Sequence, residues 1–229
     1  MRRILALVEG QTEFATLNRL IAAPLGLRGH SFQAKIIGKP GHKGGMRSYA
    51  SMWPELVALL KQERQAVVTT FFDLYALKDD WPGWSPPRTA NSLQRAEQIE
   101  RAMSVDLSAR IDPSDNLRRY IPYLQVHELE TLLYADPHAL AESFGQVALA
   151  VEFQRIVDQA GGCELIDDSP ETAPSKRLEA LFPKYKKGKG QRAHAPIAVA
   201  KIGLDTIRAA CPHFSRWLEQ LESADSIFT

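Results

Sequence analysis

Acidic side chains occur at the ends of three segments whose apolar, β-branched and aromatic composition predicts buried strands. Glu9 follows "RILALV", Asp73 lies within "AVVTTFFDLY", and Glu128 and Glu130 belong to "HELE" at residues 127–130. Glu9 and Asp73 are each embedded in an apolar run, where desolvating a charge has a cost that a bound cation would offset. Several carboxylates in one crevice also repel each other unless a cation neutralises them. The pattern therefore favours a site for a hard divalent cation, Mg²⁺ or Mn²⁺.

A turn or a helix cap is the competing interpretation of each acid. Glu13 fits the first turn of a helix, where the helix dipole and reciprocal bonding to a capping residue favour glutamate. Glu130 has the same alternative for the helix that follows it. His127, beside Glu128, fits a metal ligand, a general acid or a histidine at the edge of the core. The capping interpretation is weakest for Glu9 and Asp73, because they interrupt apolar runs.

The order of the predicted elements is that of an α/β protein with crossover helices. Strands are predicted at residues 3–8, 31–38, 66–75 and 120–128, with helices beginning near residue 12, around 53–60 and at about 91–105. In open parallel sheets, ligands collect at the carboxyl ends of the strands, which is where the acids fall. After residue 136 the pattern changes to helices broken by glycine and proline.

We therefore predict two parts. Residues 1–136 form an α/β core around a mostly parallel four-stranded sheet with flanking helices, and residues 137–229 form a helical extension packed on that core. In the last helix, an apolar stripe is predicted to face the core: Phe214, Trp217, Leu218 and Leu221.

The basic residues are concentrated rather than in excess, since the 229-residue chain has 28 Lys and Arg against 27 Asp and Glu. The segment "KYKKGKGQR" (184–192) contains Lys184, Lys186, Lys187, Lys189 and Arg192; Lys176 and Arg177 precede it, and Lys43 lies in the glycine-rich segment 38–45. Glycine breaks predict a mobile basic loop that follows a nucleic-acid backbone, although a solvated surface loop explains the same pattern. Trp81 and Trp84 either stack on bases or pin a surface loop.

Several other classes of protein are disfavoured. Cys163 and Cys211 are far apart without a CxxC spacing, so two buried free thiols are expected rather than a zinc site or a disulfide framework. No stretch approaches the roughly 20 apolar residues of a membrane span. The apolar run near the N-terminus is shorter than that of a signal peptide. We expect a cytoplasmic protein without a membrane partner.

The stretch "VEGQTE" resembles the first signature of the Toprim fold, an α/β catalytic domain of topoisomerases, primases and several bacterial nucleases. More closely, the chain resembles a bacterial Toprim-like family of unknown function, domain-of-unknown-function family 4276. The matching elements are "EGQTE" (9–13), "DLY" (73–75), "HELETLLYAD" (127–136), "PSKRLEALFPKYKK" (174–187) and "CPHFSRWLEQLE" (211–222). They span nearly the whole chain and imply a Toprim- or Rossmann-like sheet.

The resemblance assigns roles to individual positions. Glu9 corresponds to the Toprim glutamate and Asp73 to the first acid of the Asp-x-Asp pair that follows strand three. Tyr75 stands where the second aspartate belongs, which departs from two-metal Toprim chemistry. Nucleases of the related overcoming-lysogenization-defect type recruit extra acids, and Glu128 or Glu130 is in a position to do so here. Loss of catalysis is the other outcome of the same departure.

The leading hypothesis is a metal-dependent phosphodiesterase, a Toprim-type nuclease of DNA or RNA. In it Glu9, Asp73 and either Glu128 or Glu130 bind Mg²⁺ or Mn²⁺, which activates water, while Glu13 orients the water or binds a second ion. The resemblance also implies a partner ATPase of AAA or SMC type and a role in anti-phage defence or DNA processing. The alternatives are a non-catalytic partner subunit of such an ATPase and a small-molecule phosphohydrolase.

Overall fold

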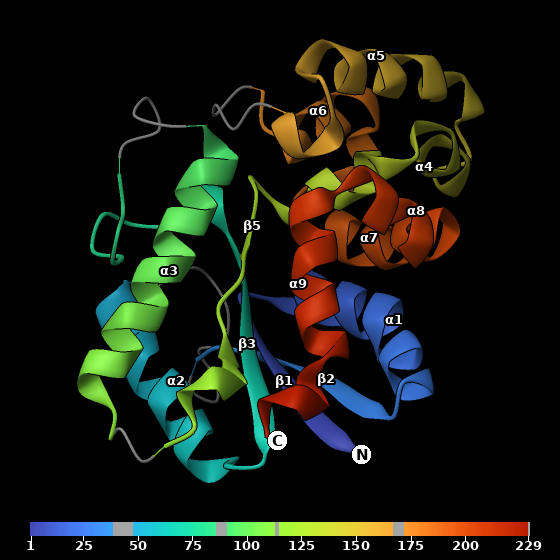
Figure 1. Ribbon diagram of the computed structural model, residues 1–229. Helices are drawn as coiled ribbons and strands as arrows, with labels where there is room; N and C mark the ends of the chain where they lie inside the picture. The colour runs from blue at the N-terminus through green and yellow to red at the C-terminus, as the bar shows by residue number, and fades with distance from the viewer. Residues whose placement is uncertain (39–47, 86–90, 113–114, 167–171, 229) are drawn as a thin grey trace.

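The computed structural model describes residues 1–38, 48–85, 91–112, 115–166 and 172–228. Within them a parallel sheet has the strand order β2-β1-β3-β4, and a short fifth strand also pairs with β3 (Figure 1). The strands are β1 (Arg2–Val8), β2 (His30–Ile36), β3 (Ala66–Asp73), β4 (Tyr120–Ile121) and β5 (Leu124–Gln125). The predicted α/β fold with a parallel sheet, flanking helices and a helical C-terminal part is confirmed.

The predicted fourth strand is interrupted at Pro122. β4 and β5 pair with β3 in one continuous register, Thr69 opposite Ile121 and Phe72 opposite Leu124. Proline has no N–H to donate to the ladder. The Thr70 hydroxyl bridges the gap instead, accepting from the Tyr123 N–H at 2.9 Å and donating to its carbonyl at 3.0 Å. The strand prediction for 120–128 is therefore too long, and the sheet ends before His127.

Alternation along the central strands gives the sheet two buried faces. Ile4, Ala6 and Val8 of β1 face one apolar cluster, while Leu5 and Leu7 face another. Helix α1 (Gln11–Leu27) covers the first face together with the C-terminal helices, and α2 (Tyr49–Gln62) and α3 (Ser92–Arg110) cover the second (Figure 1). The result is a layer of strands between two layers of helices.

The C-terminal part is helical, as predicted. Its helices are α4 (Pro137–Ser143), α5 (Ala150–Ala160), α6 (Pro174–Leu181), α7 (Lys189–Ile202), α8 (Leu204–Ala210) and α9 (Pro212–Glu222). Short 3-10 turns join the elements of the chain: Leu74–Ala76, Leu117–Arg119, Leu129–Ala135, Val147–Leu149, Cys163–Leu165, Pro183–Tyr185 and Ala224–Ile227. Buried side chains from both sides of residue 136 join one apolar cluster, and the division into two units there stays a prediction.

The last helix anchors this part to the sheet. The predicted stripe of α9 is buried, and the Trp217 indole donates to the Thr69 hydroxyl of β3 at 2.8 Å. The Trp217 ring also stacks on Tyr123, with centroids 4.6 Å apart. At the start of α9, His213 contacts Glu100 of α3 at 3.0 Å, and Glu100 accepts the Leu124 N–H of β5 at 2.7 Å. These contacts hold the helical part over one face of the sheet.

Two further expectations are answered by the fold. Cys163 and Cys211 are both buried and free, as predicted, and their Sγ atoms lie 3.1 Å apart. Across the described ranges, no helix has the length and apolar character needed to span a membrane.

Candidate active site

The adjoining ends of β1 and β3 form the point where the strand order reverses direction. From β1 the chain proceeds outward to β2 on one side and to β3 and β4 on the other, and ligands of open α/β sheets bind at such switch points. Glu9 directly follows β1, and Asp73 is the last residue of β3. The Glu9 carboxylate accepts the Asp73 N–H at 2.8 Å, and the Asp73 carboxylate accepts the Leu129 N–H at 3.0 Å. The ends of β1 and β3 and the 3-10 turn after β5 are thus joined through these two acids.

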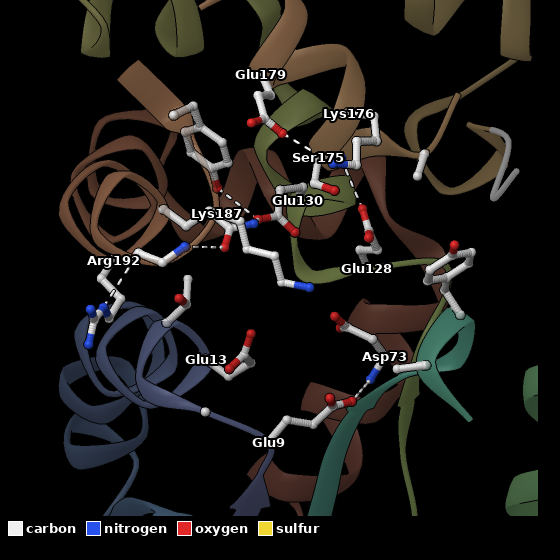
Figure 2. Close-up of a pocket in the computed structure, with 18 of the residues that line it drawn as sticks. Glu9, Glu13, Asp73, Glu128, Glu130, Ser175, Lys176, Glu179, Lys187 and Arg192 are labelled. Carbon is white, nitrogen blue, oxygen red and sulfur yellow. Dashed lines mark hydrogen bonds and ion pairs between the residues drawn. The ribbon is translucent and has the colours of Figure 1, made fainter. Parts of the chain in front are cut away.

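All five acids singled out in the sequence line one cavity of about 540 Å³ (Figure 2). We call them the acidic group: Glu9, Glu13, Asp73, Glu128 and Glu130. Glu13 belongs to the first turn of α1, and Glu128 and Glu130 lie where the chain leaves the sheet after β5. Tyr75 and Glu179 line the same cavity.

His127 shapes the turn that presents Glu128. Its φ of 62° is the one positive value among the non-glycine residues of the described chain, a conformation that is uncommon without a functional or structural reason. The side chain is buried and does not line the cavity. Of the roles considered for this histidine, its place at the edge of the core agrees with the structure.

Burial and mutual repulsion dominate the electrostatics of the acidic group. Burial raises the pKa of Glu9 to about 8, although the hydrogen bond from Asp73 lowers it, and the charge of Glu13 adds to the rise. Burial, followed by the charge of Glu9, raises the pKa of Asp73 well above its usual range. Burial also raises the pKa of Glu130 to about 8, and Glu128 contributes. Ionising several of these acids together near neutral pH is therefore unfavourable, and a cation that joined them would favour the ionised forms.

The helical part holds the outer two acids in place. The Tyr185 hydroxyl and the Gln191 amide both donate to Oε1 of Glu130, each at 3.0 Å. Glu128 accepts the N–H of Ser175, in the first turn of α6, at 2.9 Å. Second-layer bonds of this kind orient ligating carboxylates. Sequence reasoning did not find Ser175 or Gln191, because nothing local distinguishes them from other polar residues at a helix start.

Basic residues of α6, of α7 and of the turn before α7 line the same cavity as the acidic group. We call Lys176, Lys187 and Arg192 the basic wall. Lys187 points toward the acids (Figure 2), and its charge offsets part of the rise in the pKa of Glu9 and of Glu13, which burial dominates. Lys176 also pairs with Glu179 at 3.2 Å. The cavity thus combines six acidic and three basic side chains.

The remaining predicted phosphate-binding residues lie elsewhere. Lys184, Lys186 and Lys189 are exposed but do not line the cavity. Arg177 donates to the Thr172 carbonyl at 2.7 Å and also lies outside the cavity lining. Lys43 falls outside the described residues.

The prediction of a mobile basic loop over 184–192 is wrong. Residues Pro183–Tyr185 form a 3-10 turn with Tyr185 buried, and α7 begins at Lys189. A Cβ at Gly190 would clash with the Lys184 carbonyl, and Gly188 has a φ of 92°. These glycines close a tight turn that L side chains do not fit. Gly190 allows the close approach of two backbone segments and Gly188 allows a positive φ, so both serve the turn rather than mobility.

The oxygen-rich donor set suits a hard divalent cation, yet the acids do not form a ready-made coordination group. Among the described residues, no three or more Asp, Glu, His or Cys side chains are arranged to hold a metal ion. Binding an ion would require several carboxylates of the acidic group to turn toward a common point.

The comparisons with known proteins identify the family. The family described as "Domain of unknown function (DUF4276)" matches residues 8–222. The chain belongs to this family. The predicted family membership is thereby confirmed, and the individual motifs remain predictions. Among curated proteins, no relative matches.

Three solved structures of the C-terminal region of the Xanthomonas campestris pv. campestris OLD protein are also similar to this member of the family. Two of them, phased with iodine and with platinum, are 14% and 16% identical to it, with TM-scores of 0.44 and 0.47. Each match covers 99% of this chain and 96% or 94% of the other.

Proposed function

We propose that this member of the DUF4276 family is a divalent-metal-dependent phosphodiesterase, a Toprim-type nuclease acting on DNA or RNA. The observation that carries the proposal is that five carboxylates share one cavity at the switch point of a parallel sheet with the three side chains of the basic wall. A site for a phosphodiester needs both the acidic and the basic side chains. The negative nucleic-acid backbone approaches a group of carboxylates only where positive charges offset the repulsion.

The residues divide into two roles. Glu9 and Asp73, with Glu128 or Glu130, hold Mg²⁺ or Mn²⁺, which when bound supplies an activated water and stabilises charge on the phosphoryl group. Glu13, beside them in the cavity, orients the attacking water or shares a second ion. Recruitment of Glu128 or Glu130 compensates for Tyr75, which replaces the second Toprim acid.

The basic side chains bind phosphate. Lys187 faces the acids most directly, and Lys176 and Arg192 extend the same wall. The exposed Lys184, Lys186 and Lys189, outside the cavity, meet the neighbouring phosphates. Arg177 has a supporting role through its bond to the Thr172 carbonyl. Lys43 stays in the proposal as a further phosphate contact.

A cleavage assay tests the proposal. The wild type, Glu9→Gln and Asp73→Asn are compared with Mn²⁺ on plasmid, single-stranded DNA and RNA. We expect each variant to lose at least about 100-fold in rate, as for the loss of a group that acts on the transition state. Glu152→Gln, on the surface of α5 and paired with Arg155, is the control that retains activity. Equal rates in all four proteins would refute the assignment.

A second candidate is a non-catalytic partner subunit of an AAA- or SMC-like ATPase. It is favoured by Tyr75 at the second acid position and by the lack of a ready-made coordination group in the described residues. Co-purification with such an ATPase, together with no cleavage of any nucleic acid by the isolated chain, would support it. In either case we place the protein in the cytoplasm, in anti-phage defence or DNA processing.

A further inference from the structure

Tyr75 differs from every other tyrosine of the chain. Five of the six tyrosines are at most 5% exposed, whereas Tyr75 is 44% exposed and is the most exposed aromatic side chain. It nevertheless lines the cavity of the acidic group. An exposed aromatic ring beside a row of acids suggests a surface kept open for a ligand.

The backbone holds Tyr75 firmly. It follows Asp73 by two residues, in the 3-10 turn that ends β3, and its N–H donates to the His127 carbonyl at 3.1 Å. The tryptophans considered for base stacking are placed differently. Trp81 is buried against Tyr49 and Phe72, and Trp84 packs on the same cluster. Among these candidates, Tyr75 alone reaches the cavity.

The cavity therefore has both an aromatic and a basic lining beside the acids. The ring of Tyr75 comes from the 3-10 turn after β3, while the positive charges of the basic wall come from α6, α7 and the turn before α7. A nucleotide has matching parts, a flat base and a charged phosphate. Aromatic rings stack on any base, and basic grooves follow the backbone, in proteins that bind single strands. In a duplex, neighbouring bases cover both faces of each base, so stacking on Tyr75 requires an unpaired one.

Building on the proposed function, we infer that Tyr75 stacks on an unpaired nucleobase next to the phosphate held over the acidic group, and that the site prefers single-stranded nucleic acid. Tyr75 is thus a specificity-determining residue, placed where a metal-binding aspartate would stand in other Toprim domains. Its aromatic ring, rather than its hydroxyl, carries this role.

A binding experiment tests the inference without relying on cleavage. The full chain, without divalent metal, is titrated into a fluorescent single strand of about 12 nucleotides, a length within the range of single-strand sites, and into the matching duplex. A second strand contains 2-aminopurine, whose fluorescence falls when the base stacks. We expect tighter binding of the single strand, with quenching. Tyr75→Ala should weaken single-strand binding by about 5- to 150-fold and abolish quenching, as for loss of one stacking platform.

Two variants serve as controls. Tyr75→Phe keeps the ring and should bind and quench like the wild type. Phe14→Ala removes the other exposed aromatic ring, which is 37% exposed and lies outside the cavity, and should change nothing. If Tyr75→Ala binds single strands as well as the wild type does, or if the wild type binds duplex equally well, the inference is overturned while the proposed nuclease stands. If the wild type binds no nucleic acid at all, the proposed function fails as well.

Discussion

The acidic group and the basic wall line one cavity, but they are built differently. The acids follow strand ends, and backbone N–H groups of Asp73, Leu129 and Ser175 bind three of them. The basic side chains project from two helices and one turn, where Lys176, Lys187 and Arg192 are all exposed at the surface. Glu9 and Asp73 are therefore part of the sheet's own framework, whereas the basic side chains, like the carboxylates of Glu128 and Glu130, depend on how the helical part is placed.

This difference implies unequal sensitivity to mutation. A change in the acidic group should alter chemistry while the fold persists, because the sheet positions the backbone independently. A change in the turn before α7 should displace several basic side chains together. The four predictions below separate the two sides, from the largest expected effect to the smallest.

Replacing Lys187 should cause the largest loss. Lys187→Met removes the charge that points toward the acids (Figure 2) while keeping an unbranched side chain. We expect kcat/KM for cleavage to fall by about 100-fold, as when one preorganised charged donor is removed. Lys189→Met, two residues away and outside the cavity, should change it by less than about 3-fold. Equal losses of kcat/KM in both variants would show that Lys187 acts no differently from the lysines outside the cavity.

Filling Gly190 should disrupt the basic wall through its backbone. The added methyl group of Gly190→Ala meets the Lys184 carbonyl, so we expect unfolding to become easier by about 1–3 kcal/mol, as for overpacking. Gly26→Ala in α1 meets no atom within 4 Å and should be neutral or stabilising by up to about 1 kcal/mol. Chemical denaturation measures both. An unperturbed Gly190→Ala would show that this turn is not tightly closed.

The pKa values of the acidic group predict how stability depends on pH. Because Glu9 and Glu130 have pKa values of about 8 in the folded chain instead of 4.5, the folded state binds more protons than the unfolded state between these limits. Without metal, the free energy of unfolding should therefore fall as pH rises from about 4.5 to 8. Mn²⁺ binds the deprotonated carboxylates, so it should raise Tm more at pH 8.5 than at pH 6.

Thermal unfolding across this range, with Mn²⁺ or with EDTA, measures both trends. The Glu9→Gln, Glu130→Gln variant removes the two titrating groups and should show a flatter pH dependence and a smaller Mn²⁺ effect. A metal-induced rise in Tm that is equal at both pH values, or unchanged in this variant, would place the ion elsewhere.

The smallest effect is expected where the two sides meet. Tyr185→Phe removes one donor to Glu130 but leaves the bond from Gln191, so stability should fall by about 0.5–1.5 kcal/mol. Mn²⁺ affinity should fall by about 10-fold, as for loss of a residue that orients a ligand. Tyr49→Phe, which loses a bond to Asp106 on the other face of the sheet, should cost similar stability without changing Mn²⁺ affinity. Equal Mn²⁺ affinities in both variants would show that Glu130 does not bind the ion.

Local pattern was enough to predict most of the fold and the acids. β1 and β3 were predicted within about two residues because their apolar, β-branched runs are buried on both faces. The prediction of one strand over 120–128 failed at Pro122. Its missing N–H divides a run whose composition otherwise predicts a single strand. The prediction of a mobile loop around the glycines at 188 and 190 failed for another reason. Composition does not reveal whether a glycine gives freedom or allows close approach.

By itself, the sequence determined that Glu9 and Asp73 lie at the carboxyl ends of two buried strands, and therefore at one edge of a parallel sheet. Strand ends follow from the alternation and burial of neighbouring residues, which are local properties. The tertiary structure alone decided that Lys187, Ser175 and Gln191 reach those acids from more than 100 positions along the chain, because the packing of α7 on α1 and of α9 on β3 sets that placement. The tertiary structure also decided that Tyr75 lines the cavity, because the packing of the surrounding helices determines where the cavity lies.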